Sequence, residues 1–170
     1  LNFATIWEGI ADALPEKQAT GHGFEARDWA AFEDRSARLA AALEAAGVGV
    51  DDKVALFLYN GFEYEEAQFA AFKQREVPCN VNYSYLADEL AYLLENADAK
   101  VLFFDHTLGD RVADVRDRCP AVTLYVQVGG GDLLDGAVDY EALIATCEPA
   151  ERIPRSGQDL WFLYTGGTTG

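Results

Sequence analysis

The sequence contains few of the residues that build metal sites and disulfide frameworks. Its 170 residues include three cysteines, two histidines and no methionine. Cys79, Cys119 and Cys147 are an odd number, stand far apart and form no Cys-x-x-Cys pair, and no histidine stands at a metal-ligand spacing from them. This pattern argues against a zinc site and against structural disulfides. It favours reduced thiols in a cytoplasmic protein, and we expect no metal ligands in the chain.

The sequence also lacks positive charge and long apolar runs. Lys and Arg total 13 against 29 Asp and Glu, so the net charge is −16. Such a chain repels phosphate backbones and anionic bilayers, which disfavours nucleic-acid and peripheral-membrane functions. No run of about 18 apolar residues occurs, so we expect no transmembrane helix. The simplest interpretation of the charge is solubility, and the composition, half hydrophobic, is that of a globular domain.

Short apolar runs alternate with amphipathic segments along most of the chain. Strands are predicted at residues 53–59, 77–82, 101–104, 122–128 and 160–164. Helices are predicted at residues 63–75, 88–96, 108–118 and 140–146, after an earlier helix, a hairpin at 20–27 and a helix at 29–46. This alternation is typical of βαβ units. We therefore predict the α/β class, with a mainly parallel sheet wound with helices on both faces.

Several polar residues have spacings that predict helix ends. Thr5 and Glu8 have the spacing of a capping box at the start of the first helix. Asp28 is placed to cap the helix that begins at Trp29, and Gly47 to end it. His106 follows a predicted strand and is a candidate cap for the next helix.

Other polar residues have plain structural interpretations. The carboxylates at 63, 65 and 66 are expected to form one solvated helix face, and His22 a solvated turn. Cys79 has no nearby cation or base that would activate a thiolate. Gly129-Gly-Gly131 does not match a dinucleotide fingerprint, because position 134 is Leu, and it is predicted to be a surface loop.

The last seven residues, Tyr164-Thr-Gly-Gly-Thr-Thr-Gly170, are the most informative segment. They directly follow a predicted strand, and ligands of parallel sheets bind beyond the carboxyl ends of strands. Glycines leave backbone N–H groups open to an anion, and threonines add hydroxyl donors. The residue types suit a polyphosphate, while a glycine-rich linker is the alternative. No lysine follows, so the segment is not a Walker loop.

This segment resembles the start of the phosphate-loop motif of the acyl-adenylating superfamily, usually written (Y/F)-T-(S/G)-G-T-T-G-x-P-K-G. The superfamily includes acyl-CoA synthetases, luciferase-like enzymes and the adenylation domains of peptide synthetases. Gly166 stands where many members have Ser. Further segments resemble the family in order from Ile6 onwards, among them the helix from Trp29 to Leu39, Asp51–Ala55, Asn60–Tyr64 and Asn80–Tyr85. The last two resemble acyl-CoA synthetases of the fatty-acid type.

The resemblance implies an acid–thiol ligase. A carboxylic acid, here a fatty or other bulky hydrophobic acid, reacts with ATP, assisted by Mg²⁺, and the resulting acyl-adenylate is transferred to coenzyme A. The ATP phosphates would bind to Thr165, Gly166, Gly167, Thr168, Thr169 and Gly170. Coenzyme A would pass near Asn82 and Tyr83, with Asn80 and Tyr85 in the same stretch. A polar strand end followed by a helix cap is the alternative interpretation there.

In the family, the nucleotide-base motifs, the Mg²⁺-binding Glu and the mobile domain with its catalytic Lys all follow this loop. We therefore expect residues 1–170 to be one partial domain, the N-terminal portion of the AMP-binding large domain. It would contain no catalytic residue, be inactive alone and associate with itself through exposed apolar surface. Two alternatives stay open: an adenylating enzyme with a carrier-protein acceptor, and a non-catalytic α/β binding domain.

Overall fold

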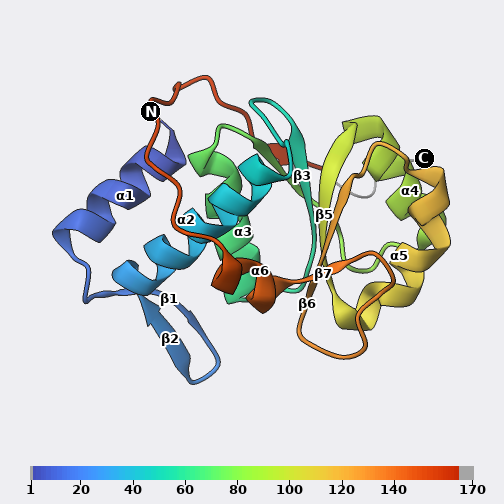
Figure 1. The fold of residues 1–170 in the computed structure, drawn as a ribbon, viewed down its shortest axis with the longest axis horizontal. Helices are drawn as coiled ribbons and strands as arrows, with labels where there is room; N and C mark the ends of the chain where they lie inside the picture. The colour runs from blue at the N-terminus through green and yellow to red at the C-terminus, as the bar shows by residue number, and fades with distance from the viewer. Residues whose placement is uncertain (1, 165–170) are drawn as a thin grey trace.

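A six-stranded sheet forms the centre of the molecule (Figure 1). The computed structural model describes residues 2–164. Its strands lie in the order β7-β6-β5-β3-β4-β8, and every described pairing in this sheet is parallel. The bounds are β3 (Lys53–Phe57), β4 (Val77–Asn80), β5 (Ala99–Asp105), β6 (Leu124–Val128), β7 (Val138–Asp139) and β8 (Phe162–Leu163). The predicted α/β class with a parallel sheet is confirmed.

Helices cover both faces of the sheet (Figure 1), as predicted. One face carries α1 (Phe3–Ala13), α2 (Trp29–Ala45), α3 (Phe62–Lys73) and α6 (Tyr140–Thr146). The other face carries α4 (Ala87–Ala97) and α5 (Gly109–Val115), the latter flanked by the single turns η1 (His106–Leu108) and η2 (Arg116–Arg118). An antiparallel hairpin, β1 (Gln18–His22) and β2 (Glu25–Asp28), projects from the body. Among residues 2–164, no helix has the length and apolar character needed to cross a membrane.

The strands are apolar because both of their faces are buried. Successive side chains of β3 enter opposite cores: Leu56 packs under α2, α3 and α6, and Phe57 packs under α4 and α5. The same alternation holds for Phe103 and Phe104 in β5. A strand buried on both faces reads as a continuous apolar run, which is why these strands were predictable from the sequence.

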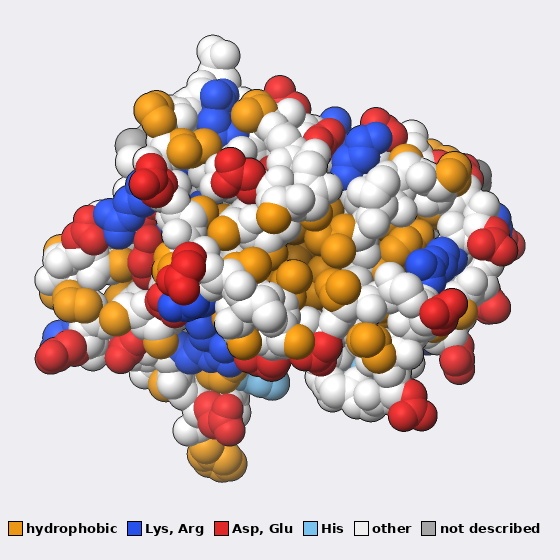
Figure 2. Space-filling model, in the orientation of Figure 1, with side chains coloured by type: hydrophobic (Ala, Val, Ile, Leu, Met, Phe, Trp, Pro, Cys, Tyr) orange, Lys and Arg blue, Asp and Glu red, His pale blue; other side chains and the backbone are white. Residues whose placement is uncertain are grey.

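Acidic side chains are scattered over the face seen in Figure 2 and do not gather in one patch. This distribution agrees with the interpretation of the net charge as a solubility feature. Figure 2 also shows an apolar area at the centre of this face, where Figure 1 shows the edge strand β7 and its neighbour β6.

The ends of two helices differ in how well they were predicted. Asp28 caps α2 by accepting a hydrogen bond from the N–H of Ala31 at 2.8 Å, and Gly47 follows α2 with a left-handed φ of 82°, as predicted. The capping box at Thr5 and Glu8 is wrong. Asn2 caps α1 instead, and Glu8 is buried in ion pairs with residues far along the chain.

Three other details differ from the expectations. The strand β7 was not predicted, because two residues carry too little periodicity. The predicted helix 108–118 is broken into η1, α5 and η2. The last predicted strand is shortened to the two residues of β8.

The prediction of a solvated carboxylate face at residues 63, 65 and 66 is wrong. Glu66 is fully buried and accepts hydrogen bonds from Arg27, from Arg35 at 3.0 Å and from the hydroxyl of Tyr140 at 2.6 Å. These donors come from β2, α2 and α6, so the carboxylate joins three elements that pack on α3. A buried charge requires such partners, which the local sequence around Glu66 does not reveal.

Candidate functional site

The carboxyl ends of the parallel strands meet at one edge of the sheet, called here the carboxyl edge. β4 and β8 are neighbours, and Asn80 is paired with Leu163. Tyr164 therefore leaves the sheet beside the segment that follows Asn80. The topology brings together two stretches that the sequence singled out, residues 80–85 and the residue directly before position 165.

A cavity of about 220 Å³ lies where these segments meet. Its lining comes from the ends of β3, β4 and β8, namely Leu58, Asn60, Asn80, Val81, Asn82, Tyr83 and Tyr164. Ligand pockets usually enclose about 300–1,000 Å³, so this cavity is smaller than a complete ligand site. Its polar lining consists of three amides and two phenols, all uncharged donors and acceptors.

The segment after β4 has a defined conformation. The side chain of Asn82 accepts a hydrogen bond from the N–H of Ser84 at 2.9 Å, which closes a local turn. Arg111 of α5 donates to the backbone carbonyls of Tyr83 at 2.7 Å and Tyr85 at 3.0 Å. The turn is thus held by α5, with the side chains of Asn82 and Tyr83 exposed at the rim of the cavity.

A tyrosine pair separates this cavity from a second one. The rings of Tyr59 and Tyr83 lie 5.0 Å apart between centroids. Beyond them is another cavity of about 220 Å³, lined by His22, Leu58, Tyr59, Asn60, Gly61, Glu63, Asp105 and Val128. Neither cavity has a lysine or arginine among its described lining residues. An anion bound here would meet neutral donors and two carboxylates rather than a basic cluster.

Burial favours the neutral forms of three ionisable groups beside the first cavity, Tyr64, Tyr164 and Cys79. Burial raises the pKa of Tyr64, whose hydroxyl donates to the side-chain oxygen of Asn80 at 3.2 Å. Burial also raises the pKa of Tyr164, which donates to Asn96 at 2.7 Å. The thiol of Cys79 is buried, and burial raises its pKa to about 12. It therefore cannot serve as a thiolate nucleophile, as the sequence indicated.

The predicted site residues are described in part. Asn82 and Tyr83 line the first cavity, together with Asn80. The six predicted phosphate-binding residues, Thr165, Gly166, Gly167, Thr168, Thr169 and Gly170, lie outside the described residues. Within residues 2–164, no group of three or more His, Cys, Asp or Glu side chains is arranged to hold a metal ion.

The triple glycine forms a cradle for an imidazole. All three glycines at 129–131 have left-handed φ values of 75–90°, and Cβ atoms added at Gly129 or Gly131 would lie 2.9 Å from the ring of His106. The prediction that His106 caps the next helix is wrong, because Asp105 caps η1 through the N–H of Thr107. His22 is exposed, as predicted.

Sequence reasoning missed two contributions to the carboxyl edge. Asn60 lines both cavities, although the sequence analysis placed it in a segment that resembles the family without naming it as a site residue. Tyr64 supports Asn80 from α3. The signal for Asn60 was present, since it directly follows a buried strand, but nothing in the sequence links Tyr64 to a residue of the next strand.

Comparison with known proteins identifies relatives over the whole chain. The sequence profile of the AMP-binding enzyme family matches residues 7–170. A 3-oxocholest-4-en-26-oate–CoA ligase of Rhodococcus rhodochrous is 38% identical over 175 residues, covering 100% of this chain and 32% of that protein. The medium-chain acyl-CoA ligase Mig of Mycobacterium avium is 35% identical and is matched over 97% of this chain and 33% of its own length. The chain thus spans about a third of the length of these relatives.

Solved structures share the fold. The anthranilate CoA ligase AuaEII, in complex with anthranoyl-AMP, superposes with a TM-score of 0.93 at 20% identity, over 100% of this chain and 33% of that one. A benzoate CoA ligase from Burkholderia xenovorans LB400 gives 0.84 at 20% identity, over 95% of this chain and 32% of that one. The family profile, which runs into the glycine- and threonine-rich segment, and the shared fold lead to one conclusion: this chain belongs to the AMP-binding enzyme family.

Proposed function

We propose that this chain is the amino-terminal part of an ATP-dependent acyl-CoA ligase that activates a fatty or other bulky hydrophobic acid. One observation carries the proposal: proteins that match essentially the whole chain at 35–38% identity are named acyl-CoA ligases, for a steroid acid and for medium-chain acids. The chain spans a third of those relatives, so we propose that residues 1–170 are one partial domain without activity of its own.

The proposed reaction has two steps. A carboxylate oxygen of the acid attacks the α-phosphorus of ATP, the bond to the bridging oxygen breaks, and pyrophosphate leaves. The thiolate of coenzyme A then attacks the acyl carbon of the adenylate, and AMP leaves with the bonding electrons. Charge develops on the leaving pyrophosphate in the first step, so preorganised donors around it lower the barrier.

We assign the donors to the segment that follows β8. Its glycines, Gly166, Gly167 and Gly170, would let backbone N–H groups approach the phosphates closely, and its threonines, Thr165, Thr168 and Thr169, would add hydroxyl donors. Support comes from the position of Tyr164 at the carboxyl edge, beside an uncharged polar cavity. A site without basic residues in its described lining needs neutral donors of this kind.

We assign the approach of coenzyme A to the turn at Asn82 and Tyr83. Their side chains are exposed at the rim of the first cavity, and Arg111 fixes the backbone beneath them. Amides and phenols can bind the pantetheine amides of coenzyme A by hydrogen bonds. An exposed pair on a fixed turn suits a ligand that enters from solvent.

The described residues supply no complete site for Mg²⁺. Among residues 2–164, no group of three or more His, Cys, Asp or Glu side chains is arranged to hold a metal ion, and Asp105 and Glu63 of the second cavity belong to no such group. We therefore assign the metal ligands of the proposed ligase to residues outside this part of the chain.

We further propose that the chain 1–170 associates with itself through the β8 end of the sheet. β8 pairs with β4 on one side, and among the described residues no strand pairs with its other side. Leu160, Trp161 and Leu163 are exposed there. Sedimentation at tens of micromolar is expected to give a dimer or larger species, and a Leu163→Lys variant should shift it to monomer. A monomer for the unmodified chain contradicts this proposal.

The cysteines support a reducing compartment. Cys79, Cys119 and Cys147 are all free thiols in the structure. We propose the cytoplasm as the working location on this ground, because a half-buried thiol such as that of Cys147 persists where reductants keep it reduced.

The test uses the full-length protein that contains this chain. Octanoate and 3-oxocholest-4-en-26-oate are each incubated with ATP and labelled pyrophosphate, and the acid-dependent exchange of label into ATP is measured. Thr168→Ala is expected to lower exchange by about 10²–10³-fold, the typical cost of removing one oxyanion donor. Thr146→Ala, at an exposed position at the end of α6, is the matched control and should leave exchange unchanged.

The same assay separates the alternatives. Formation of an acyl-CoA thioester on adding coenzyme A supports the ligase. Exchange without thioester formation favours a carrier-protein acceptor. Absence of exchange with any acid in the full-length protein favours a non-catalytic binding domain and overturns the proposal.

A further inference from the structure

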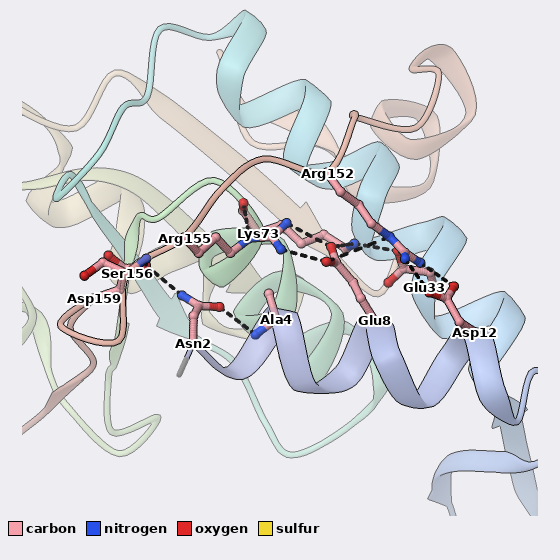
Figure 3. Close-up of polar contacts among 10 residues, drawn as sticks. All are labelled: Asn2, Ala4, Glu8, Asp12, Glu33, Lys73, Arg152, Arg155, Ser156 and Asp159. Atoms are coloured by element: carbon pink, nitrogen blue, oxygen red, sulfur yellow. Dashed lines mark hydrogen bonds and ion pairs between the residues drawn. The ribbon is translucent and has the colours of Figure 1, made fainter.

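The connector between α6 and β8 has no helix or strand, yet it is tightly bound to the protein. Its first part contacts α2, where the N–H of Ala150 donates to the carbonyl of Ala37 at 3.0 Å, and the stretch from Arg152 to Asp159 runs along α1 and the end of α3 (Figure 3). Three charged residues at intervals of three or four, Arg152, Arg155 and Asp159, attach it there. An extended segment outside a sheet makes few backbone hydrogen bonds, so these side chains form most of its attachments to the protein.

Arg155 forms the buried middle attachment. Its guanidinium donates to both oxygens of Glu8, at 2.6 and 2.8 Å, and to the backbone carbonyl of Lys73 at 2.8 Å. The ammonium of Lys73 donates to Glu8 at 2.8 Å and to Glu33 at 2.7 Å. Burial alone would raise the pKa of Glu8, but the hydrogen bonds from Arg155 and Lys73 outweigh it and hold the pKa below its usual value. Glu8 is therefore ionised and fully paired.

Asp159 forms the attachment nearest to β8. One carboxylate oxygen accepts two hydrogen bonds from Arg75, each at 3.0 Å. The other accepts from the side-chain amide of Asn2 at 2.9 Å and from the N–H of Ser156 at 3.1 Å. Arg75 lies in the turn just before β4, the strand with which β8 pairs. Asp159 thus connects the segment before β8 to the turn before β4 and to the start of α1.

β8, the strand that follows the connector, is too short to be fixed in place by its own pairing with β4. Among residues 2–164, β8 makes two register pairs with β4, Cys79 with Phe162 and Asn80 with Leu163. A two-residue strand at the end of a sheet contributes little pairing energy. Trp161 adds an edge-to-face contact with Phe3 of α1, at 5.9 Å between ring centroids. The location of β8 therefore depends on what fixes the residues just before it.

We propose that Asp159, with its donors Arg75 and Asn2, is a positioning clasp for β8 and for the start of the phosphate-binding segment. This inference rests on the proposed function for its effect on ATP. The Asp159 carboxylate is buried and Arg75 is half-buried, and such a pair contributes little net stability compared with apolar residues, whereas its charge-assisted hydrogen bonds have a defined geometry. The clasp therefore sets where Tyr164 leaves the sheet, and the ATP affinity of the adjoining segment depends on that point.

The test compares two buried carboxylates in the full-length protein. Asp159→Asn removes the charge at the clasp. Glu66→Gln removes the charge of another buried carboxylate with two guanidinium donors, which contacts β2, α2 and α6 but not the connector. Both variants are expected to lower stability, so a loss common to both is structural. Arg75→Gln, at a half-buried position, weakens the clasp without altering Asp159. It replaces Asp159→Asn in the test if that variant does not fold.

Two measurements give the outcome. Hydrogen–deuterium exchange at residues 160–164 should become at least about tenfold faster in the clasp variants and stay unchanged in Glu66→Gln. The KM for ATP should rise about tenfold in the clasp variants, a loss of about 1.4 kcal/mol in binding. Glu66→Gln should leave the KM for ATP unchanged. It should lower only the maximal rate, because a smaller fraction of the protein is folded. Unchanged protection at 160–164 in both clasp variants overturns the clasp, and lost protection with an unchanged KM overturns its role in positioning.

The two readouts also separate this inference from the proposed function. A wild-type protein without ATP-dependent activity refutes the ligase assignment. Hydrogen exchange still decides, in that case, whether Asp159 and Arg75 fix the location of β8.

Discussion

The middle of the sheet and its β8 end are built in different ways. β5 has seven residues, pairs with a strand on each side, and has four consecutive side chains, Val101 to Phe104, that are fully buried. β8 has two residues, pairs on one side, and its Leu163 side chain is 58% exposed. Burial of apolar area fixes the first, and directional ion pairs of the preceding connector fix the second.

This difference separates stability from geometry. Hydrophobic burial is strong but non-directional, so it holds β3 and β5 in the centre without setting fine positions at the ends. The clasp at Asp159 and the cluster around Glu8 are directional and depend on charge. Substitutions in apolar regions should therefore change the unfolding free energy independently of pH, whereas substitutions of buried charged groups should change it in a pH-dependent way. Four predictions test this difference.

The largest effect is expected from the middle of the sheet. Phe103 is fully buried in the core under α2, α3 and α6. Phe103→Ala should lower the free energy of unfolding by about 3–5 kcal/mol, because it loses transfer free energy and leaves a cavity. Chemical denaturation measures this loss, which should not change with pH between 5 and 8. A loss below about 1 kcal/mol would show that the core is not the principal source of stability.

The next largest effect is expected from the ion-pair cluster. Glu8→Gln leaves Lys73 and Arg155 buried with a reduced set of partners, and should cost roughly 3 kcal/mol at pH 7. The pKa of Glu8 is lowered in the folded protein, so its stabilisation is present above the unfolded carboxyl pKa and is lost as pH falls through the folded value. Denaturation curves of wild type and variant should therefore converge below about pH 4. Curves that stay parallel on acidification contradict the ion-pair explanation.

A gain in stability is expected at Glu76, a buried carboxyl at the opposite edge of the sheet. Neither of its oxygens has a hydrogen-bond partner among residues 2–164. Burial, and then the charges of Asp52 and Glu44, raise its pKa well above the usual value. Glu76→Met should stabilise the protein by roughly 1–3 kcal/mol at alkaline pH, because it removes an unsatisfied buried group.

The pH dependence of that gain has a definite sign. A raised carboxyl pKa means that the cost of Glu76 grows as pH rises from the unfolded pKa through the folded one. The gain of Glu76→Met over wild type should therefore shrink on acidification, as followed by denaturation at pH 5 and pH 8. Glu76→Gln, which keeps a polar group but removes the charge, should gain less. A gain independent of pH would assign the effect to packing alone.

The smallest effect is expected at a surface ion pair. Arg118 donates to Asp88 at 2.8 Å, but the Asp88 side chain is 92% exposed. Arg118→Ala should change the unfolding free energy by less than about 0.5 kcal/mol. Thermal or chemical denaturation should give curves that nearly superpose, and a larger change would mean that exposed charges also contribute to the architecture.

Much of the fold could be predicted because its information is local. The runs at β3 and β6 and the helix over residues 140–146 are visible as apolar patterns, and Asp28 and Gly47 mark the ends of α2 through their own chemistry. The position of β8 beside β4 is not local, since the two strands stand some eighty residues apart. No pattern within either strand specifies its neighbour.

The errors concern charged residues whose partners are distant in sequence. Glu8 was assigned to a capping box from its spacing to Thr5, yet its partners are Lys73 and Arg155. Glu66 was assigned to a solvated face, yet Tyr140 and two arginines bury it. The sequence singled out the stretches after β4 and before residue 165, which the pairing of β4 with β8 brings together, but it did not predict the support of Asn80 by Tyr64.

The long separation between Glu8 and its partner Arg155 has a consequence for synthesis on the ribosome. Glu8 emerges 147 residues before Arg155. At about 5–20 residues per second, this is a delay of roughly 7–30 s, during which Lys73 can already neutralise Glu8 but the connector does not yet exist. The contact that seals the first helix onto the domain is thus translated long after the helix itself. A nascent chain halted before Arg152 should expose α1 to proteases that cannot reach it once Asp159 has left the ribosome.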